Sequence, residues 1–152
     1  MQNQDNKYLL DYYRLAFLSL KQRRTSENIN LAKPILVLSV LDCIEEGDIV
    51  DNKIIYNVVK KKYEKLLSTA QEAPTPMKYP FYHLVSDGFW HITWNSGVII
   101  PAHSPSDKFL RENIAFASFD NALWDLLREQ TNRDFYRKAI IGYYKIVTKD
   151  IQ

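Results

Sequence analysis

The feature that most constrains the fold is an apolar run from Pro34 to Ile44, PILVLSVLDCI, in which the only charged residue is Asp42. Proline is accepted in the first turn of a helix because the N–H that it lacks has no helical partner there. Gly47 is well placed to end the helix. A helix that is apolar on nearly every side must be covered on every side. We therefore expect a central buried helix over residues 34–46.

Apolar residues at helical spacing predict more helices around this one. A first helix is expected over residues 7–22 and a third over residues 55–67, with a loop over 23–30. Two further helices are expected near the C-terminus, one marked by apolar residues from Phe119 to Leu127 and one from Phe135 to Val147. Ser106 is positioned to cap a short helix before them.

A segment of different character separates the helices. Ala73-Pro74-Thr75-Pro76 interrupts helix formation, and residues 79–85 and 89–94 are rich in aromatic and β-favouring side chains. Because Ser86-Asp87-Gly88 between them is a turn signal, we predict a β-hairpin over 79–94, with a third short strand at 98–100. The expected fold is α+β: one mostly helical domain, residues 1–152, with a small antiparallel hairpin packed on the central helix.

Composition excludes several classes of protein. Of 152 residues, 46% are hydrophobic and 25% charged, which is typical of a globular domain. The sequence has no apolar run long enough to cross a bilayer and no signal-peptide pattern, so we expect a cytoplasmic protein without membrane contact. The single cysteine, Cys43, excludes an internal disulfide and a multi-cysteine zinc site, and its apolar surroundings predict a buried structural thiol.

No complete catalytic set is visible. The histidines are His83, His91 and His103, and the first two flank the predicted hairpin turn. A metal site would need them to converge with carboxylates, and packed structural histidines are the commoner case. The sequence contains neither a phosphate-binding glycine loop nor a nucleophile elbow. We expect no cofactor, no metal and no enzymatic activity; an enzyme would need a cleft that brings a histidine to a carboxylate.

Two places stand out as candidate binding residues. Lys33 lies at the start of the buried helix, where free N–H groups and the helix dipole favour an anion, although this is also an ordinary helix start. Tyr79 and Pro80 are expected at an exposed rim, because proline within a strand lies at an edge or bulge. The net charge of +2 is a weak signal. Clusters of basic residues are commonly solvated helix faces; they occur at Lys21, Arg23 and Arg24, and at Lys60, Lys61, Lys62 and Lys65.

Two motifs resemble a known family. They are K-P-x-L-x-L-x-x-L-x-x-I-x-x-G over residues 33–47 and Y-P-F-x-x-L-x-x-D-G-F-W-H over residues 79–91. This pair is similar to the N-terminal domain of predicted HNH-type restriction endonucleases, and to the related sulfur-binding domain of modification-dependent restriction enzymes, which recognises phosphorothioate DNA. The broader resemblance runs from about residue 7 to residue 147.

The resemblance implies roles for matching residues. In the sulfur-binding domains a histidine and a basic residue precede the proline; here these positions hold Ala32 and Lys33. The tyrosine–proline pair that floors the sulfur pocket is matched by Tyr79 and Pro80, and His83 stands where a small residue is expected. A phosphorothioate sulfur is larger and less well hydrated than oxygen, so an apolar ring surface accepts it at little desolvation cost.

The expected function is DNA recognition in a restriction or defence system. Lys33, Tyr79, Pro80 and His83 are expected to converge on one exposed, positively charged, shallow pocket for a backbone group, with Lys78, Arg23 and Arg24 supplying further salt-dependent contacts. The ligand is left open between phosphorothioate, other modified DNA and plain DNA. A protein-interaction module without DNA binding is the alternative.

The resemblance also implies a partner. In the nuclease relatives, cutting belongs to a separate C-terminal ββα-metal domain, so a nuclease domain or subunit is the expected partner. The chain ends at Gln152, directly after its last predicted helix, and is expected to be either a truncated piece or a stand-alone module.

Overall fold

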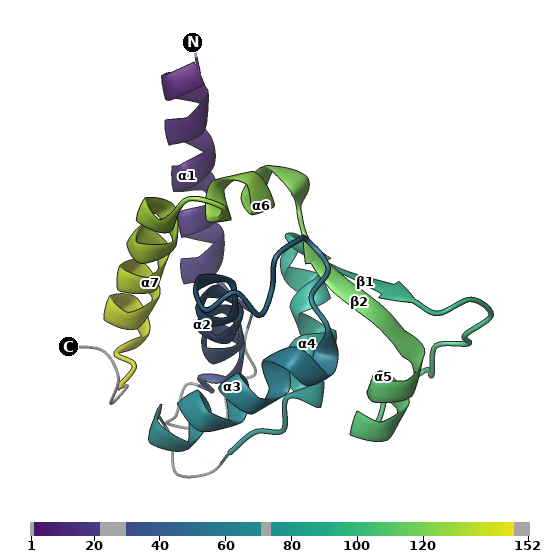
Figure 1. Ribbon diagram of the computed structural model, residues 1–152. Helices are drawn as coiled ribbons and strands as arrows, with labels where there is room; N and C mark the ends of the chain where they lie inside the picture. Colours follow the sequence, from purple (N-terminus) through teal and green to yellow (C-terminus); the bar gives the residue numbers. More distant parts are fainter. Residues whose placement is uncertain (1, 22–29, 71–73, 148–152) are drawn as a thin grey trace.

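The computed structural model describes residues 2–21, 30–70 and 74–147 (Figure 1). Its first half is helical, with α1 (Gln2–Leu18), α2 (Ala32–Glu45), α3 (Tyr56–Ala70), α4 (Lys78–His83) and the 3-10 helix η1 (Leu84–Asp87). Strand β1 (Trp90–Trp94), α5 (Asp107–Asn113), β2 (Ile114–Phe119), α6 (Asn121–Leu127) and α7 (Gln130–Tyr144) follow. The α+β class is confirmed, because most of these elements are helical and the two strands form one antiparallel sheet.

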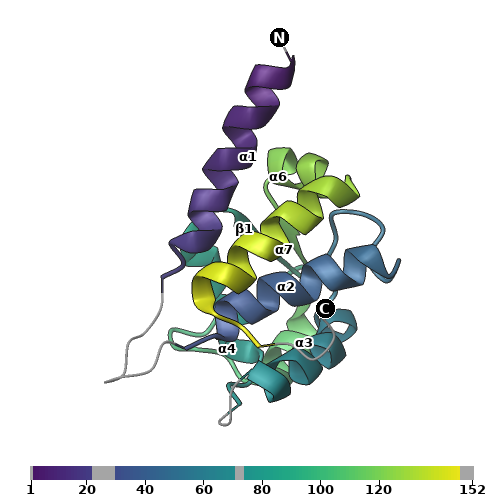
Figure 2. The same ribbon diagram turned by 90° about the vertical axis from the view of Figure 1, so that its left-hand side faces the viewer.

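Helix α2 is the central buried element, as predicted. It begins two residues before Pro34, which therefore lies within the first turn, where no N–H is needed. Gly47 follows the helix with φ of 83°, in the left-handed region that favours glycine. Residues 34–41 are all buried, and α2 packs against α3, α4 and α7. Figure 2 shows α2 between α7 and α3.

Helices α1 and α7 pack together on one side of α2. The Tyr136 hydroxyl donates to the carbonyl of Leu10 at 2.9 Å, and the Tyr144 hydroxyl donates to that of Phe17 at 2.7 Å. The N-terminal part of α1 projects beyond the rest of the molecule (Figure 1). Helix α7 confirms the predicted last helix, whereas the helix predicted from Phe119 begins only at Asn121, because Phe119 ends β2. No helix among the described residues is long and apolar enough to span a membrane.

The predicted β-hairpin over residues 79–94 is wrong. Residues 78–87 are helical, and β1 pairs with β2, which comes about twenty residues later in the chain. Pro80 is the third residue of α4, a first-turn position that proline tolerates as readily as a strand edge. Gly88, with φ of 93°, ends η1 and does not form a hairpin turn. Burial of Phe81 and Leu84 on one helical face outweighs the β-propensity of the segment.

The sheet completes the core. Trp90 pairs with Phe119 and Ile92 with Ala117, and an isolated bridge joins Ile54 to Ala117. The Trp90 indole donates to the carbonyl of Phe81 at 2.9 Å and so ties α4 to β1. The residues predicted to be buried are buried, namely Leu36, Leu38, Leu41, Phe81, Leu84 and Trp90.

Predictions about short segments and single residues are partly confirmed and partly wrong. Residues 98–100 belong to the loop between β1 and α5, so the third strand predicted there is wrong. Ser106 does cap α5, since its hydroxyl accepts the N–H of Phe109 at 3.1 Å. Cys43 is buried, and burial raises the pKa of its thiol to about 11. Most of the loop predicted over 23–30 lies outside the described residues.

Candidate nucleic-acid interface

A pocket with a volume of about 640 Å³ opens where the start of α2 meets α4. Lys33, Tyr79, Pro80 and His83 all line it, so the structure brings these four predicted residues together. They come from segments that are more than forty residues apart in the sequence. The remaining lining residues are Lys21, Asn30, Ala32, Thr75, Ser86 and Ser104.

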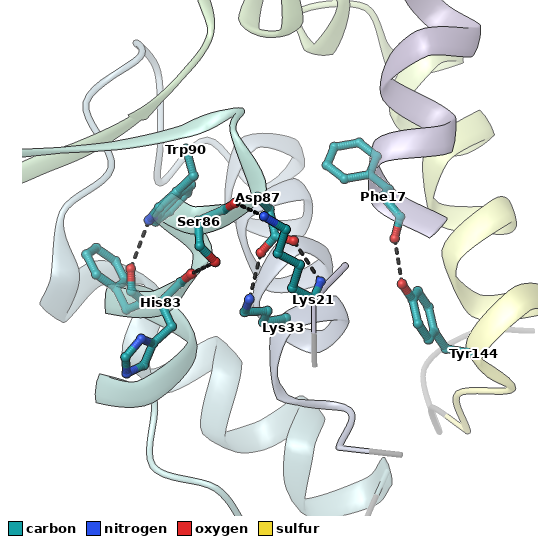
Figure 3. A network of polar contacts seen from close by, with 9 residues as sticks. Phe17, Lys21, Lys33, His83, Ser86, Asp87, Trp90 and Tyr144 are labelled. Carbon is teal, nitrogen blue, oxygen red and sulfur yellow. Dashed lines mark hydrogen bonds and ion pairs between the residues drawn. The ribbon is translucent and has the colours of Figure 1, made fainter. Parts of the chain in front are cut away.

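Lys33, which lines one wall of the pocket, forms an ion pair with Asp87, which does not line it. The Lys33 Nζ lies 2.6 Å from Asp87 Oδ2, and the two side chains are only 11% and 4% exposed. Asp87 Oδ1 also accepts the backbone N–H of Lys21 at 2.7 Å (Figure 3). The sequence indicated only a turn at Asp87, so its role as the partner of Lys33 was missed. The carboxylate compensates the charge of Lys33, and this lysine alone does not make the pocket positive.

Lys21 supplies the charge that Lys33 does not. Its Nζ donates to the carbonyl of Ser86 at 3.0 Å and, within the described residues, contacts no carboxylate. The side chain is exposed at the pocket. A backbone carbonyl leaves the ammonium charge uncompensated, so Lys21 is the stronger electrostatic attractor for an anion here. The sequence placed Lys21 in a basic cluster without assigning it to the site.

The floor of the pocket is apolar. The prediction that Pro80 lies at an exposed rim is wrong, because Pro80 is buried in the first turn of α4. Ala32, which is 4% exposed, presents a methyl group at the start of α2. The Tyr79 ring is 41% exposed, and the Nζ of Lys78 lies 4.9 Å from its centroid. A cation over a ring face is held electrostatically. Lys78 is therefore attached to the pocket through Tyr79, although it does not line the pocket itself.

His83 lines another side of the pocket. Its Nε2 lies 2.8 Å from Ser104 Oγ, which belongs to the loop between β1 and α5. Partial burial, and secondarily the charge of Lys33, lower the pKa of the imidazole below its ordinary value of 6.5. A neutral imidazole therefore predominates at neutral pH. Ser104 was not identified from the sequence, since nothing in the order of residues indicates that its loop returns to α4.

The remaining candidates are two arginines and a histidine. Arg23 and Arg24 are outside the described residues. His91 Nε2 lies 2.6 Å from Asp120 Oδ1, and the Tyr13 hydroxyl donates to the other oxygen of Asp120 at 2.8 Å. This contact joins β1, α1 and the start of α6 away from the pocket. In the part of the chain that the structure describes, no three His, Cys, Asp or Glu side chains are grouped to hold a metal ion.

The motifs that form the pocket fall within a family match. Residues 14–145 match the family described as ScoMcrA-like, DNA sulfur-binding domain. The chain belongs to this family. The family is defined by a binding function, and this agrees with the prediction of a recognition domain without catalysis. Comparison with curated proteins finds no match.

Solved structures share the fold of this sulfur-binding family member. The sulfur-binding domain of ScoMcrA in complex with phosphorothioated DNA superposes with a TM-score of 0.73 at 15% identity, over 91% of each chain. The corresponding complex of SprMcrA gives a TM-score of 0.68 at 20% identity, over 90% of this chain and 85% of that one. Similarity also extends to the Type IV phosphorothioation-dependent restriction endonuclease ScoMcrA, with a TM-score of 0.70 at 16% identity; 88% of this chain covers 29% of that chain.

Proposed function

We propose that this sulfur-binding domain recognises DNA by holding a modified backbone group, a phosphorothioate, in the pocket between α2 and α4. The observation that carries the proposal is the arrangement of that pocket, where an apolar floor of Tyr79 and Pro80 adjoins a lysine whose charge is largely compensated. ScoMcrA and SprMcrA domains of this fold have been solved with phosphorothioated DNA, and the chain belongs to their family.

The pocket suits sulfur better than oxygen on physical grounds. A phosphate oxygen that enters an apolar site loses hydrogen bonds to water, and it regains them only from donors in the site. Lys33 uses one of its three N–H donors on Asp87 at 2.6 Å, and that carboxylate compensates its charge, so Lys33 replaces those waters only in part. A sulfur atom has weaker hydration to lose and packs against the Tyr79 and Pro80 rings. Selectivity then arises from desolvation, while affinity arises from charge.

Charge outside the floor attracts the backbone in general. Lys21 at the pocket and Lys78 beside Tyr79 are the cations that face a phosphate chain, and they carry no sequence information. The family resemblance implies a histidine where this chain has Ala32 and a small residue where it has His83. Both positions lie in the lining of the pocket, so they bear directly on the strength of sulfur selectivity.

The proposed role includes a partner. The ScoMcrA endonuclease is more than three times as long as the part that this chain covers. We propose that recognition by this domain directs a nuclease domain or subunit to marked DNA in a restriction or defence system, and that it acts in the cytoplasm, where the DNA is. An HNH nuclease as that partner stays a prediction.

Binding to matched duplexes tests the proposal. The wild-type chain should bind a phosphorothioate duplex more tightly than a plain duplex of the same sequence, measured by fluorescence anisotropy at low and at physiological salt. Pro80→Ala should reduce this preference because it removes apolar floor without removing charge. Pro76→Ala, at an exposed position outside the pocket, is the matched control.

Three outcomes of this binding experiment would contradict part of the proposal. No binding to either duplex at low salt would refute DNA recognition by this chain and favour the protein-interaction alternative. Equal binding to both would refute sulfur recognition and leave general DNA binding. A preference that Pro80→Ala and Pro76→Ala reduce equally would show that the proline floor is not its source.

A further inference from the structure

A second hollow of about 350 Å³ adjoins the pocket. We call it the apolar trough; its own walls are Tyr82, Val85, Ile92, Trp94 and Ile100. His83 and Ser86 line both the trough and the pocket and form the boundary between them. The trough thus continues the proposed backbone site toward β1 and the loop that follows it.

The trough is apolar but open to solvent. Val85 and Ile100 are 44% and 46% exposed, and the Tyr82 and Trp94 rings lie edge to face with centroids 6.3 Å apart. Apolar surface of this kind is unfavourable in water, and covering it with a ligand is favourable. The trough therefore favours an occupant with C–H surface over an ionic one.

The polar side chains at the boundary between the trough and the pocket are already engaged. The Ser86 hydroxyl donates to the His83 carbonyl at 2.9 Å, and His83 Nε2 is paired with Ser104 Oγ at 2.8 Å. The Ser86 carbonyl accepts from Lys21. A hydroxyl group that entered the trough at this boundary would give up water without a ready partner in His83 or Ser86, at a free-energy cost.

The proposed ligand of the pocket is a polymer, so the part of the polymer next to the bound group is the natural occupant of the trough. A backbone group in the pocket is covalently joined to a sugar on each side, so an adjoining nucleotide must lie beside the pocket. We propose that the apolar trough binds the deoxyribose of that adjoining nucleotide and selects 2′-deoxyribose over ribose. This inference rests on the proposed function and adds to it a subsite that distinguishes DNA from RNA, for which the 2′-hydroxyl is the distinguishing group.

The test uses phosphorothioate duplexes with one altered sugar. A ribonucleotide is placed singly on the 5′ or the 3′ side of the phosphorothioate. A 2′-fluoro nucleotide, which favours the same sugar pucker as ribose without the hydroxyl, is the control at each position. For the wild type, one of the two ribonucleotides should weaken binding about fivefold or more, because its hydroxyl is buried without a partner. The 2′-fluoro nucleotide should weaken it much less.

Protein variants locate the effect. Val85→Ser and Ile100→Ser should each weaken binding of the all-deoxy duplex about threefold or more, because they remove apolar surface from the trough. In both variants the ribonucleotide should weaken binding by a smaller factor than it does in the wild type. Ile99→Ser is the matched control: Ile99 lies in the same loop and is 86% exposed, but it does not line the trough, so binding should not change.

The outcomes separate this inference from the proposed function. If the wild type does not prefer the phosphorothioate duplex, the proposed function fails first. If it keeps that preference while Val85→Ser and Ile100→Ser bind like Ile99→Ser, the trough does not contact DNA and the inference is overturned. Equal penalties for the ribonucleotide and the 2′-fluoro nucleotide would also overturn it, because sugar pucker alone would then explain the weaker binding.

Discussion

At the scale of single residues, the pairing of Lys33 with Asp87 changes what each of them does. A lysine at the start of a buried helix was predicted as an anion-binding residue. It donates instead to a carboxylate that is 4% exposed. Breaking a buried pair leaves one charge uncompensated, which is costly even where the pair itself adds little stability. Lys33 is therefore part of the structure of the pocket as well as of its surface.

We predict that Lys33→Ala destabilises the domain by about 3 kcal/mol, because Asp87 remains buried without its cation. Urea denaturation measures this change. The double variant Lys33→Met with Asp87→Asn should recover much of the stability, since no charge is left unpaired. Lys61→Ala, at an exposed position on α3, should leave stability unchanged. A Lys33→Ala domain as stable as the wild type would show that the ion pair does not support the fold.

His83 gives a second prediction, on pH. In the free domain its pKa lies below 6.5 because of partial burial and the charge of Lys33, and a bound backbone anion raises that pKa. The complex therefore takes up a proton, so DNA affinity should increase as pH falls through the pKa of the complex and level off below that of the free domain. The increase should reach about two- to tenfold between neutral pH and the plateau.

Titration of binding between pH 5 and pH 8 checks this dependence. His83→Gln should flatten the profile, whereas His103→Gln, at an exposed position outside the pocket, should leave it as in the wild type. Protonation adds charge toward plain and phosphorothioate duplexes alike, so the ratio of the two affinities should stay constant. A wild-type profile that persists in His83→Gln would assign the titration to another group.

At the scale of elements, the sequence predicts what is local and misses what is not. The nearly continuous apolar run of α2, with Pro34 in its first turn, was enough to identify the central helix. The segment 77–84 also carries a helical pattern, since Met77, Pro80, Phe81 and Leu84 are all buried, but its aromatic content favoured a strand. The true partner of β1 is β2, and residues 114–119 gave no strand prediction because their pairing is with a distant segment.

The same distinction applies to the pocket. Lys33, Tyr79, Pro80 and His83 were predicted together because two motifs carry them. Lys21 and Ser104 reach the pocket from the end of α1 and from the loop before α5, and only tertiary packing brings them there. Asp87 was recognised as a turn residue, but its contact with Lys33 depends on the helix that replaced the predicted hairpin.

Glycine substitutions test the left-handed backbone with which Gly88 ends η1. Gly88 has φ of 93°, and a Cβ there would meet open space, so Gly88→Ala should destabilise by about 1–2 kcal/mol through backbone strain alone. Gly142 in α7 also has open space but a helical backbone, so Gly142→Ala should stabilise by about 0.5–1 kcal/mol. Thermal unfolding of the two variants should show shifts of opposite sign. Shifts of the same sign would contradict a left-handed turn at Gly88.

At the scale of the whole molecule, charge and apolar surface have separate roles in binding. The chain carries a net charge of only +2, and the ion pair of Lys33 with Asp87 beside the pocket adds no net charge. Among the described residues, we therefore expect Lys21 and Lys78 to attract the DNA backbone at the site, equally for any DNA sequence. In the proposed binding mode, selectivity for sulfur comes from the apolar floor of Tyr79 and Pro80, and its strength does not depend on salt.

If charge and apolar surface act separately, plots of affinity against salt concentration for the two duplexes should be parallel. Phosphate and phosphorothioate duplexes carry the same charge, so the logarithm of affinity should fall with the logarithm of salt concentration at one common slope. Lys21→Met should reduce both slopes by about 0.9, because one phosphate fewer is neutralised, and leave the gap between the lines unchanged. Lys7→Met, on the projecting part of α1, should change neither. Anisotropy titrations at four salt concentrations measure slope and gap together. If the gap closes as salt rises, selectivity is electrostatic, and the apolar floor is not its source.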